Sequence, residues 1–364
     1  MRKLFPIFIL LVFLLTNCNS SVKQVPEVPK EQAANLNDKA VKDAAKLNNI
    51  LDQFAAPSQF FEVPADRESV IKGEKGTTLF IDPQDLELVN GQKLGSTIKV
   101  ELKELTSQSD LLRNNTQTVS NGKLLVSGGA YYIHITSDGE QAKLKSNATL
   151  SVAFPRITER KMELFYGTRD SLDRINWEPA GQEFAAKAIK KEKPRSEEVT
   201  SVKIVKSELD QIFDYIENDS TPYQSRSEAE KRNEVRNKLY EDVYDAIQLK
   251  ALEWINVDMF LDAANTTDLK YTFAGPAKIE SANILVVFTD MNSVIQEYYF
   301  AYGKNFNAQT ISGLPVGNNI KFIAYSILDD KVYAYSTKLK LKTGQSIQVE
   351  LKEMGKDALR QILK

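Results

Sequence analysis

The sequence predicts a mainly β protein with a helical insert: a β-sandwich-like N-terminal domain, a helical hairpin and an immunoglobulin-like C-terminal β-sandwich. The first observation is period-two alternation, as in Ile98, Val100 and Leu102, which are separated by Lys and Glu residues. The second is frequent turn chemistry, such as Asn90-Gly91 and Asn121-Gly122 between alternating runs. Alternation places every second side chain on one face of a strand, and Asn-Gly favours tight hairpin turns.

The start of the chain resembles an exported, lipid-modified protein. An apolar run from Leu4 to Leu15 follows a basic start, and Leu15-Thr16-Asn17 precedes Cys18, the only cysteine. This run is shorter than the roughly 20 helical residues that cross a membrane, but it suits a secretory signal. The Leu-small-small-Cys pattern is typical of a lipobox. We therefore expect residues 1–17 to be a lipoprotein signal peptide and Cys18 to carry palmitate-like acyl chains; an uncleaved anchor or a free thiol is the alternative.

The residues after Cys18 predict where the protein lies. Asn19 and Ser20 follow the cysteine in place of an Asp, which favours the cell outer membrane over the inner one. Several acyl chains on one cysteine anchor a protein stably. Residues 18–30, with Pro26 and Pro29, are predicted to form a tether. Whether the anchored protein faces the periplasm or the cell surface stays open.

An Ala-rich segment, residues 31–56, is predicted to form an amphipathic helix. Its apolar residues recur at spacings of three and four, which aligns them along one stripe. The stripe consists of Ala40, Ala44, Leu47, Leu51 and Phe54. Packing on its own domain is the favoured interpretation, and a coiled coil or a partner-binding helix is the alternative.

The rest of the chain divides by pattern. Residues 57–181 are predicted to form the β-sandwich-like domain, and the Lys-rich residues 182–205 a linker. Residues 206–256 show helical periodicity, with a capping box at Ser227 and Glu230, and are predicted to form the helical hairpin. Strand patterns return over residues 257–352, the predicted immunoglobulin-like sandwich, and residues 353–364 close the chain with a helix.

The inventory of reactive side chains argues against an enzyme. The chain has one His and one Cys, so it cannot build a Cys-His pair with a lipidated cysteine or a zinc site with two histidines. Alternation places His134 with Tyr132 and Thr136, opposite Tyr131, Ile133 and Ile135, which predicts a solvent-facing side chain. We expect no catalytic site, no cofactor and no metal site; a glycosidase with paired carboxylates stays as a third alternative.

The charge balance argues against a nucleic-acid partner. There are 47 Lys and Arg against 49 Asp and Glu, which leaves no basic excess to follow a phosphate backbone. Aromatic residues of the last domain suggest another kind of binding, since exposed tyrosines stack on sugars or dock partners. The candidate stacking residues are Tyr298, Tyr299, Tyr302, Tyr325, Tyr333 and Tyr335. Their alternative role is packing on the sandwich.

Several segments resemble uncharacterised lipoproteins of Bacteroidetes with two β modules. The segments are residues 73–77 with 80–81, residues 100–105, and residues 118–125 with 127–133. Residues 252–260 resemble the Trp-Ile-Asn segment before the C-terminal sandwich of that group. The resemblance implies an architecture and an envelope location. It also implies candidate O-glycosylation sites at Ser171 and Ser220, each in a short Asp-Ser pattern.

Together, these patterns predict a lipid-anchored cell-envelope protein with a structural or protein-interaction role and no catalytic activity. The alternative is a carbohydrate-binding accessory lipoprotein. The expected partners are the membrane, through the lipid anchor, and an envelope protein or polysaccharide. Exposed, coplanar tyrosines would favour the alternative, and buried or scattered ones would favour the structural role.

Overall fold

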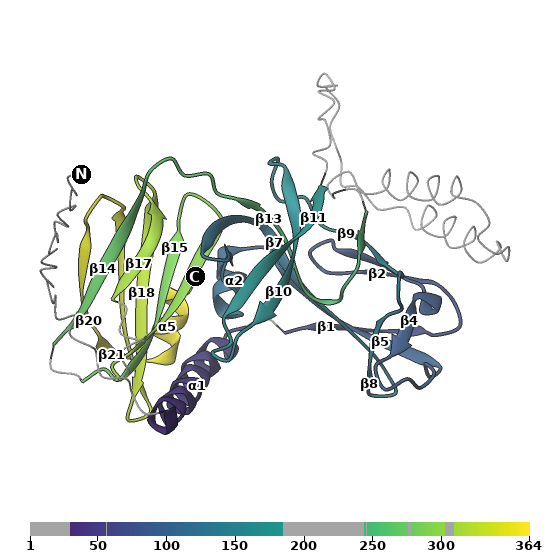
Figure 1. Ribbon diagram of the computed structural model, residues 1–364, viewed down its shortest axis with the longest axis horizontal. Coiled ribbons are helices and arrows are strands. Elements are labelled where there is room, and N and C mark those ends of the chain that lie inside the picture. Colours follow the sequence, from purple (N-terminus) through teal and green to yellow (C-terminus); the bar gives the residue numbers. More distant parts are fainter. Residues whose placement is uncertain (1–29, 56, 185–243, 245, 276–277, 303–308) are drawn as a thin grey trace, which may run out of the picture.

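The structure is a computed structural model that describes residues 30–55, 57–184, 244, 246–275, 278–302 and 309–364 (Figure 1). It is mainly β, with several antiparallel sheets and few helices, which confirms the predicted fold class at that level. The predicted signal peptide, Cys18, most of the tether, most of the linker, Ser220 and most of the predicted helical hairpin lie outside the described residues.

The first module consists of two facing sheets. One follows the order β1-β5-β7-β13-β10-β11, with β4, β6 and β8 joined beside it, and the other follows β12-β9-β3-β2. Side chains such as Leu102, Ile133 and Ile255 from the larger sheet share one apolar core with Leu79 and Val152 from the smaller. The strands are β1 (Gln59–Pro64), β2 (Ser69–Lys72), β3 (Thr78–Ile81), β4 (Leu86–Leu88), β5 (Thr97–Leu105), β6 (Val119–Ser120), β7 (Lys123–Ser137), β8 (Glu140–Leu144), β9 (Leu150–Ala153), β10 (Met162–Arg169), β11 (Ile175–Phe184), β12 (Ile247–Leu249) and β13 (Glu253–Phe260).

The long strand β7 shows how the sequence builds this module. Tyr131, Ile133 and Ile135 are fully buried in the core, whereas Tyr132 and His134 on the opposite face are half-buried. This is the predicted alternation. Two short helical segments, η1 (Pro83–Asp85) and α2 (Gln108–Arg113), interrupt the strands.

The second module also has two facing sheets around its own core. They follow the orders β17-β14-β20 and β16-β15-β18-β19-β21. All pairs are antiparallel except that of β14 with β20, which is parallel. The elements are β14 (Thr266–Ala274), β15 (Ser281–Phe288), β16 (Ser293–Phe300), β17 (Thr310–Pro315), β18 (Asn319–Leu328), β19 (Lys331–Lys340), β20 (Ser346–Glu350), β21 (Lys352–Met354) and α5 (Lys356–Ile362).

The immunoglobulin-like prediction needs correction in its topology. In constant-type immunoglobulin domains the first and second strands share a sheet. Here β14 lies in the three-stranded sheet with β17 and β20, while the next strand, β15, lies in the other sheet. Sequence alternation identifies strands but not their sheet partners, so it predicted two facing sheets without their strand order.

The predicted boundaries between modules also differ from the structure. The end of the predicted hairpin, residues 206–256, is not helical: β12 pairs with β9, and β13 pairs with β7 and β10 inside the first module. The second module therefore begins after Phe260 and not at residue 257. The buried, β-branched Ile255 and Val257, two residues apart, are the strand signal that the helical interpretation overlooked.

A third apolar core joins the two modules through the helix α1 (Lys30–Asp52), which lies at the foot of their junction in Figure 1. The predicted stripe is buried in this core: Ala40, Ala44, Leu47, Leu51 and Phe54. The core also contains Leu285 and Ile323 from the second module, and Leu111 and Trp177 from the first. No helix within the described residues is long and apolar enough to cross a membrane.

Candidate functional site

The tyrosines predicted to stack on a ligand do not form an exposed platform. Tyr298, Tyr299 and Tyr325 are buried, the first and last beneath α1 and Tyr299 in the core of the second module. The Tyr298 hydroxyl donates to Asn48 Oδ1, and the Tyr325 hydroxyl donates to the Leu47 carbonyl at 3.2 Å. These hydroxyls therefore hold α1 on the sheet.

The other three tyrosines are half-buried: Tyr302 packs against the core between the modules, and Tyr333 and Tyr335 pack against the core of the second module. The Tyr302 hydroxyl donates to Asp43 Oδ2 of α1 at 2.6 Å, and the Tyr333 hydroxyl donates to Glu353 at 3.3 Å. Tyr335 packs against the second module's core, 6.4 Å from Phe322 between ring centroids. The arrangement is scattered, which favours the structural role over stacking on a ligand.

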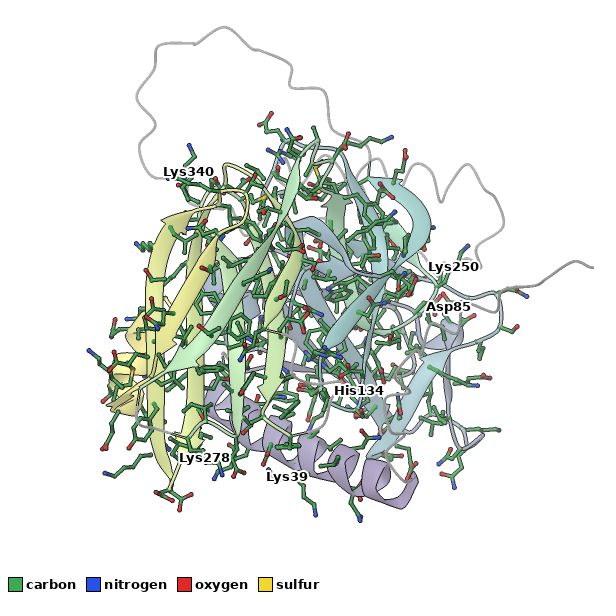
Figure 2. The ribbon with its side chains drawn as sticks, turned by 60° about the vertical axis from the view of Figure 1, so that its left-hand side comes forward. Lys39, Asp85, His134, Lys250, Lys278 and Lys340 are labelled. Carbon is green, nitrogen blue, oxygen red and sulfur yellow. The ribbon has the colours of Figure 1, made fainter. Side chains whose placement is uncertain are left out.

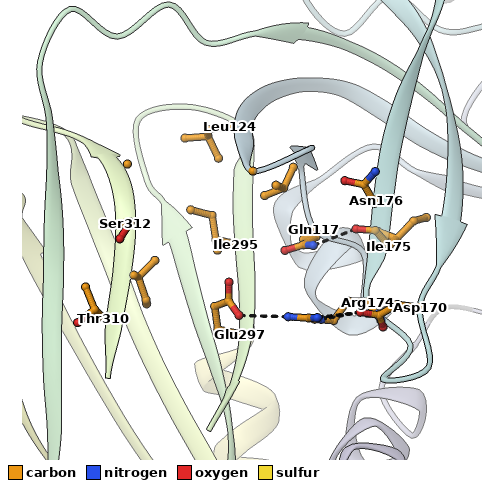
Figure 3. Close-up of a pocket in the computed structure, with 14 residues that line it drawn as sticks. Gln117, Leu124, Asp170, Arg174, Ile175, Asn176, Ile295, Glu297, Thr310 and Ser312 are labelled. Atoms are coloured by element: carbon orange, nitrogen blue, oxygen red, sulfur yellow. Dashed lines mark hydrogen bonds and ion pairs between the residues drawn. The ribbon is translucent and has the colours of Figure 1, made fainter. Parts of the chain in front are cut away.

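A pocket of about 470 Å³ lies at the seam between the modules (Figure 3). Its walls are β16 and β17 on one side and β11 with residues 117–124 on the other. At its centre Arg174 of the first module bridges Asp170, 2.8 Å away, and Glu297 of the second module, 3.3 Å away. Partial burial raises the pKa of Glu297, and the nearby Arg174 acts against that rise.

The polar groups of this seam pocket already bond to one another. Gln117 Nε2 donates to the Ile175 carbonyl at 2.9 Å, while Gln117 Oε1 accepts from the Gln296 amide at 3.2 Å. Asn176 Nδ2 donates to Asn121 at 3.1 Å. Two of these contacts cross the seam, Gln117 with the Gln296 amide and Arg174 with Glu297, and the others lie within the first module. The pocket's polar groups therefore bond to the protein itself and connect the two modules. The exposed Ser171, a candidate O-glycosylation site, lies in the turn beside Asp170.

Part of the outer face of the large sheet carries exposed or half-buried aromatic side chains, of which Trp254 also packs against the core between the modules. We call this the aromatic face and define it by Phe60, Glu101, Lys103, Tyr132, His134 and Trp254. Two cross-strand rows build it. Phe60 pairs with Glu101 and Glu101 with His134 in one row; Lys103 pairs with Tyr132 and Tyr132 with Trp254 in the other.

The rings of the aromatic face form a series. Tyr132 and His134 are nearly parallel, at 9° with centroids 6.1 Å apart, and Tyr132 lies 5.0 Å from Trp254. The Arg169 guanidinium lies 4.5 Å from the Trp254 ring centroid and donates to the carbonyl oxygens of Asn115 and Asp173. Figure 2 shows His134 on the strand surface above α1. Its side chain is half-buried, so the predicted orientation away from the core is correct.

A second pocket, of about 390 Å³, opens beside this face. Phe60 and Lys103 belong to both, and Lys72, Lys75 and Glu104 are among its other lining residues. Glu104 is buried and accepts from the Lys75 amide at 2.8 Å, the Thr77 amide at 2.9 Å and Gln59 Nε2 at 2.9 Å. This carboxylate therefore fixes the turn that follows β2, and with it one wall of the pocket.

One carboxyl group is fully buried in the first module. Asp258 on β13 accepts a hydrogen bond from Asn256 Nδ2 at 2.6 Å, and burial raises the pKa of Asp258 to about 7. Neither of the two pockets described above contains Asp258. Because burial disfavours its charged form, the protonation of this carboxyl group affects the stability of the fold.

The described residues contain no group of three or more His, Cys, Asp and Glu placed to hold a metal ion. Sequence reasoning missed the aromatic face, although one signal was available. In residues 59–64 the apolar Phe61 and Val63 alternate with Phe60 and Glu62, which places Phe60 on the polar side of its strand.

Comparisons with protein-family models, with curated proteins and with solved structures find no match to this chain.

Proposed function

We propose that the protein is a lipid-anchored component of the bacterial outer membrane that acts as a rigid scaffold for other envelope components. One observation supports this most directly: α1 and an apolar core shared by both modules join them into one body. A fixed relation between two modules suits a structural or interaction role. The proposal includes no catalytic activity.

Hydrogen bonds between the modules add to this rigidity. The Thr118 amide donates to the Val294 carbonyl at 2.8 Å, and the Ser127 amide donates to the Asn292 carbonyl at 2.8 Å. These bonds use the otherwise unpaired edge of β16, whose exposed backbone groups would need partners. The first module thus protects an edge strand of the second.

The position of α1 links the proposed anchor to this body. Residues 18–30, the predicted tether, lead directly into α1, whose apolar stripe lies between the modules. A lipid on Cys18 would therefore be connected through the tether to the helix between the modules. This connection would hold both modules within one tether length of the membrane.

The anchor is tested by membrane fractionation of a Cys18→Ala variant, with Ser20→Ala as the matched control. We expect the wild type and the control to fractionate with outer membranes and the Cys18→Ala protein to be released, because it cannot carry acyl chains. Crosslinking of the intact protein in its own envelope, followed by mass spectrometry, should give a stoichiometric protein partner. Membrane retention of the Cys18→Ala protein would contradict the anchor, and the lack of any reproducible protein partner would contradict the scaffold role.

A further inference from the structure

We infer that the aromatic face, with the 390 Å³ pocket beside it, is a binding site for an uncharged glycan. This goes beyond the scaffold role, since a scaffold needs no glycan site. The proposed site also differs from the one predicted at the tyrosines of the second module, which are buried or scattered. The inference rests on one exposed ring, on the surroundings of that ring and on the pairing of nearby charges.

Phe60 is the first observation. It is 62 % exposed, and among the described residues no other aromatic side chain falls in the exposed class. Its neighbours Phe61 and Val63 already supply the apolar contacts of β1 with the core. Burying a Phe side chain is favourable, so leaving one in water gives the fold no benefit. A ligand that covers the ring would recover that free energy.

The surroundings of Phe60 fit a sugar. A pyranose ring has one face of C–H groups and a rim of hydroxyls, so it needs apolar rings beside hydrogen-bonding groups. Phe60 and Tyr132 offer ring surfaces, and Glu101 and Lys103 lie on the strand between them. Trp254, packed against the core between the modules and covered on its ring by Arg169, borders these two rings. The adjacent pocket adds charged side chains, including Lys72 and Glu74, at its walls. Such a mixture is typical of small-molecule sites.

The charges near the face favour an uncharged ligand. Glu62 and Lys99, the next row along the sheet, are 3.5 Å apart, and Lys75 lies 2.7 Å from Asp110. Glu104 is held by three hydrogen-bond donors of the protein. The face and the pocket together carry three lysines and three glutamates, Lys72, Lys75, Lys103, Glu74, Glu101 and Glu104, so the site presents no strong field of either sign. It therefore complements a neutral glycan better than an acidic polysaccharide or a nucleic acid.

The spectroscopic properties of the chain make this site easy to test. It has only two Trp residues, of which Trp177 is fully buried in the core and Trp254 lies at the aromatic face. The experiment titrates the full-length protein with three probes: a β-linked glucose oligomer, an N-acetylglucosamine oligomer and the acidic polymer polygalacturonate. Calorimetry gives the affinity, and Trp fluorescence reports contact near Trp254. The two neutral probes distinguish a plain glucan from a peptidoglycan-like glycan as the source.

We expect at least one neutral oligomer to bind, to change the Trp fluorescence and to keep its affinity when the salt concentration is raised. Phe60→Ala should weaken binding roughly tenfold, and Phe60→Tyr should retain it, because stacking needs the ring. Val89→Ala is the matched control: Val89 is 56 % exposed and lies outside the aromatic face, so this variant should bind as the wild type does.

Three results would overturn the inference. The first is no binding of either neutral oligomer to a folded protein. The second is equal binding by Phe60→Ala and the wild type, which would place the glycan elsewhere. The third is binding of polygalacturonate alone with loss at high salt, which would identify an acidic ligand. The scaffold proposal is judged separately, by fractionation and crosslinking, so the two can fail independently.

Discussion

At the scale of single residues, Asp258 is the least expected feature of the protein. A buried carboxylate is costly, and here the group sits on a central strand with one amide donor at 2.6 Å. Burial raises its pKa to about 7, and hydrogen bonds from Ser127, Asn256 and the Gly128 amide act against that rise. Sequence patterns could not predict this burial, because in the sequence Asp258 alternates with buried apolar residues, as a solvent-facing residue does.

The pKa of Asp258 predicts how stability depends on pH. The folded-state pKa, about 7, lies above the unfolded value of about 3.8, so the folded state binds the proton more tightly. The contribution of protonated Asp258 to the free energy of unfolding is fully present below about pH 4. It is lost as the pH rises through 7, an effect on the order of 4 kcal/mol. We expect Asp258→Asn, which cannot ionise, to gain stability relative to the wild type between pH 4 and pH 8. Urea denaturation across this range measures it, and parallel pH profiles for the two proteins would refute the assignment.

The aromatic face shows a second limit of prediction from sequence alternation. Alternation correctly predicted that His134 points away from the core, and the same rule applied to residues 59–64 would have placed Phe60 beside it on the outer face. What alternation could not supply is the order of strands β1, β5, β7 and β13, which brings Phe60, Tyr132 and Trp254 onto one surface. That order depends on long-range pairing.

At the scale of elements, α1 shows the difference between what local sequence predicts, the helix itself, and what depends on distant residues, its packing partners. The helix spans Lys30–Asp52, close to the predicted residues 31–56, because its apolar side chains recur at helical spacing. Its partners are far away in the chain, among them Tyr325, whose hydroxyl donates to the Leu47 carbonyl. Helical periodicity predicts which face of a helix is buried, but it does not predict which residues pack against that face. For the strand β13 the local prediction itself was wrong, because its two-residue period follows directly after a helical pattern in the sequence.

The burial of the α1 stripe makes its own prediction. Leu51 is fully buried in the core that joins the modules, so Leu51→Ala should lower the free energy of unfolding by about 2–5 kcal/mol. Val41, on the same helix, is 37 % exposed, and Val41→Ala should change it by less than about 1 kcal/mol. Chemical denaturation followed by circular dichroism compares the two. Equal effects would show that α1 does not pack as described.

At the scale of the whole molecule, three apolar cores account for the architecture: one inside each module and a third between them. The predicted division at residues 181 and 257 missed the return of β12 and β13 to the first module. Because of this return, the described residues on either side of the gap at 185–243, Phe184 and Tyr244, both lie in the core of the first module. The third core and the Arg174 bridge between Asp170 and Glu297 then fix the second module against the first.

The shared core at α1 should hold the two modules together as one rigid body. The distance distribution between two spin labels, at Lys93→Cys in the first module and Lys342→Cys in the second, in a Cys18→Ser background, measures this rigidity. Both side chains are exposed, so labelling should not disturb packing. We expect a single narrow distance peak, which Leu51→Ala should broaden. A broad or multiple distribution in the protein with α1 intact would contradict it.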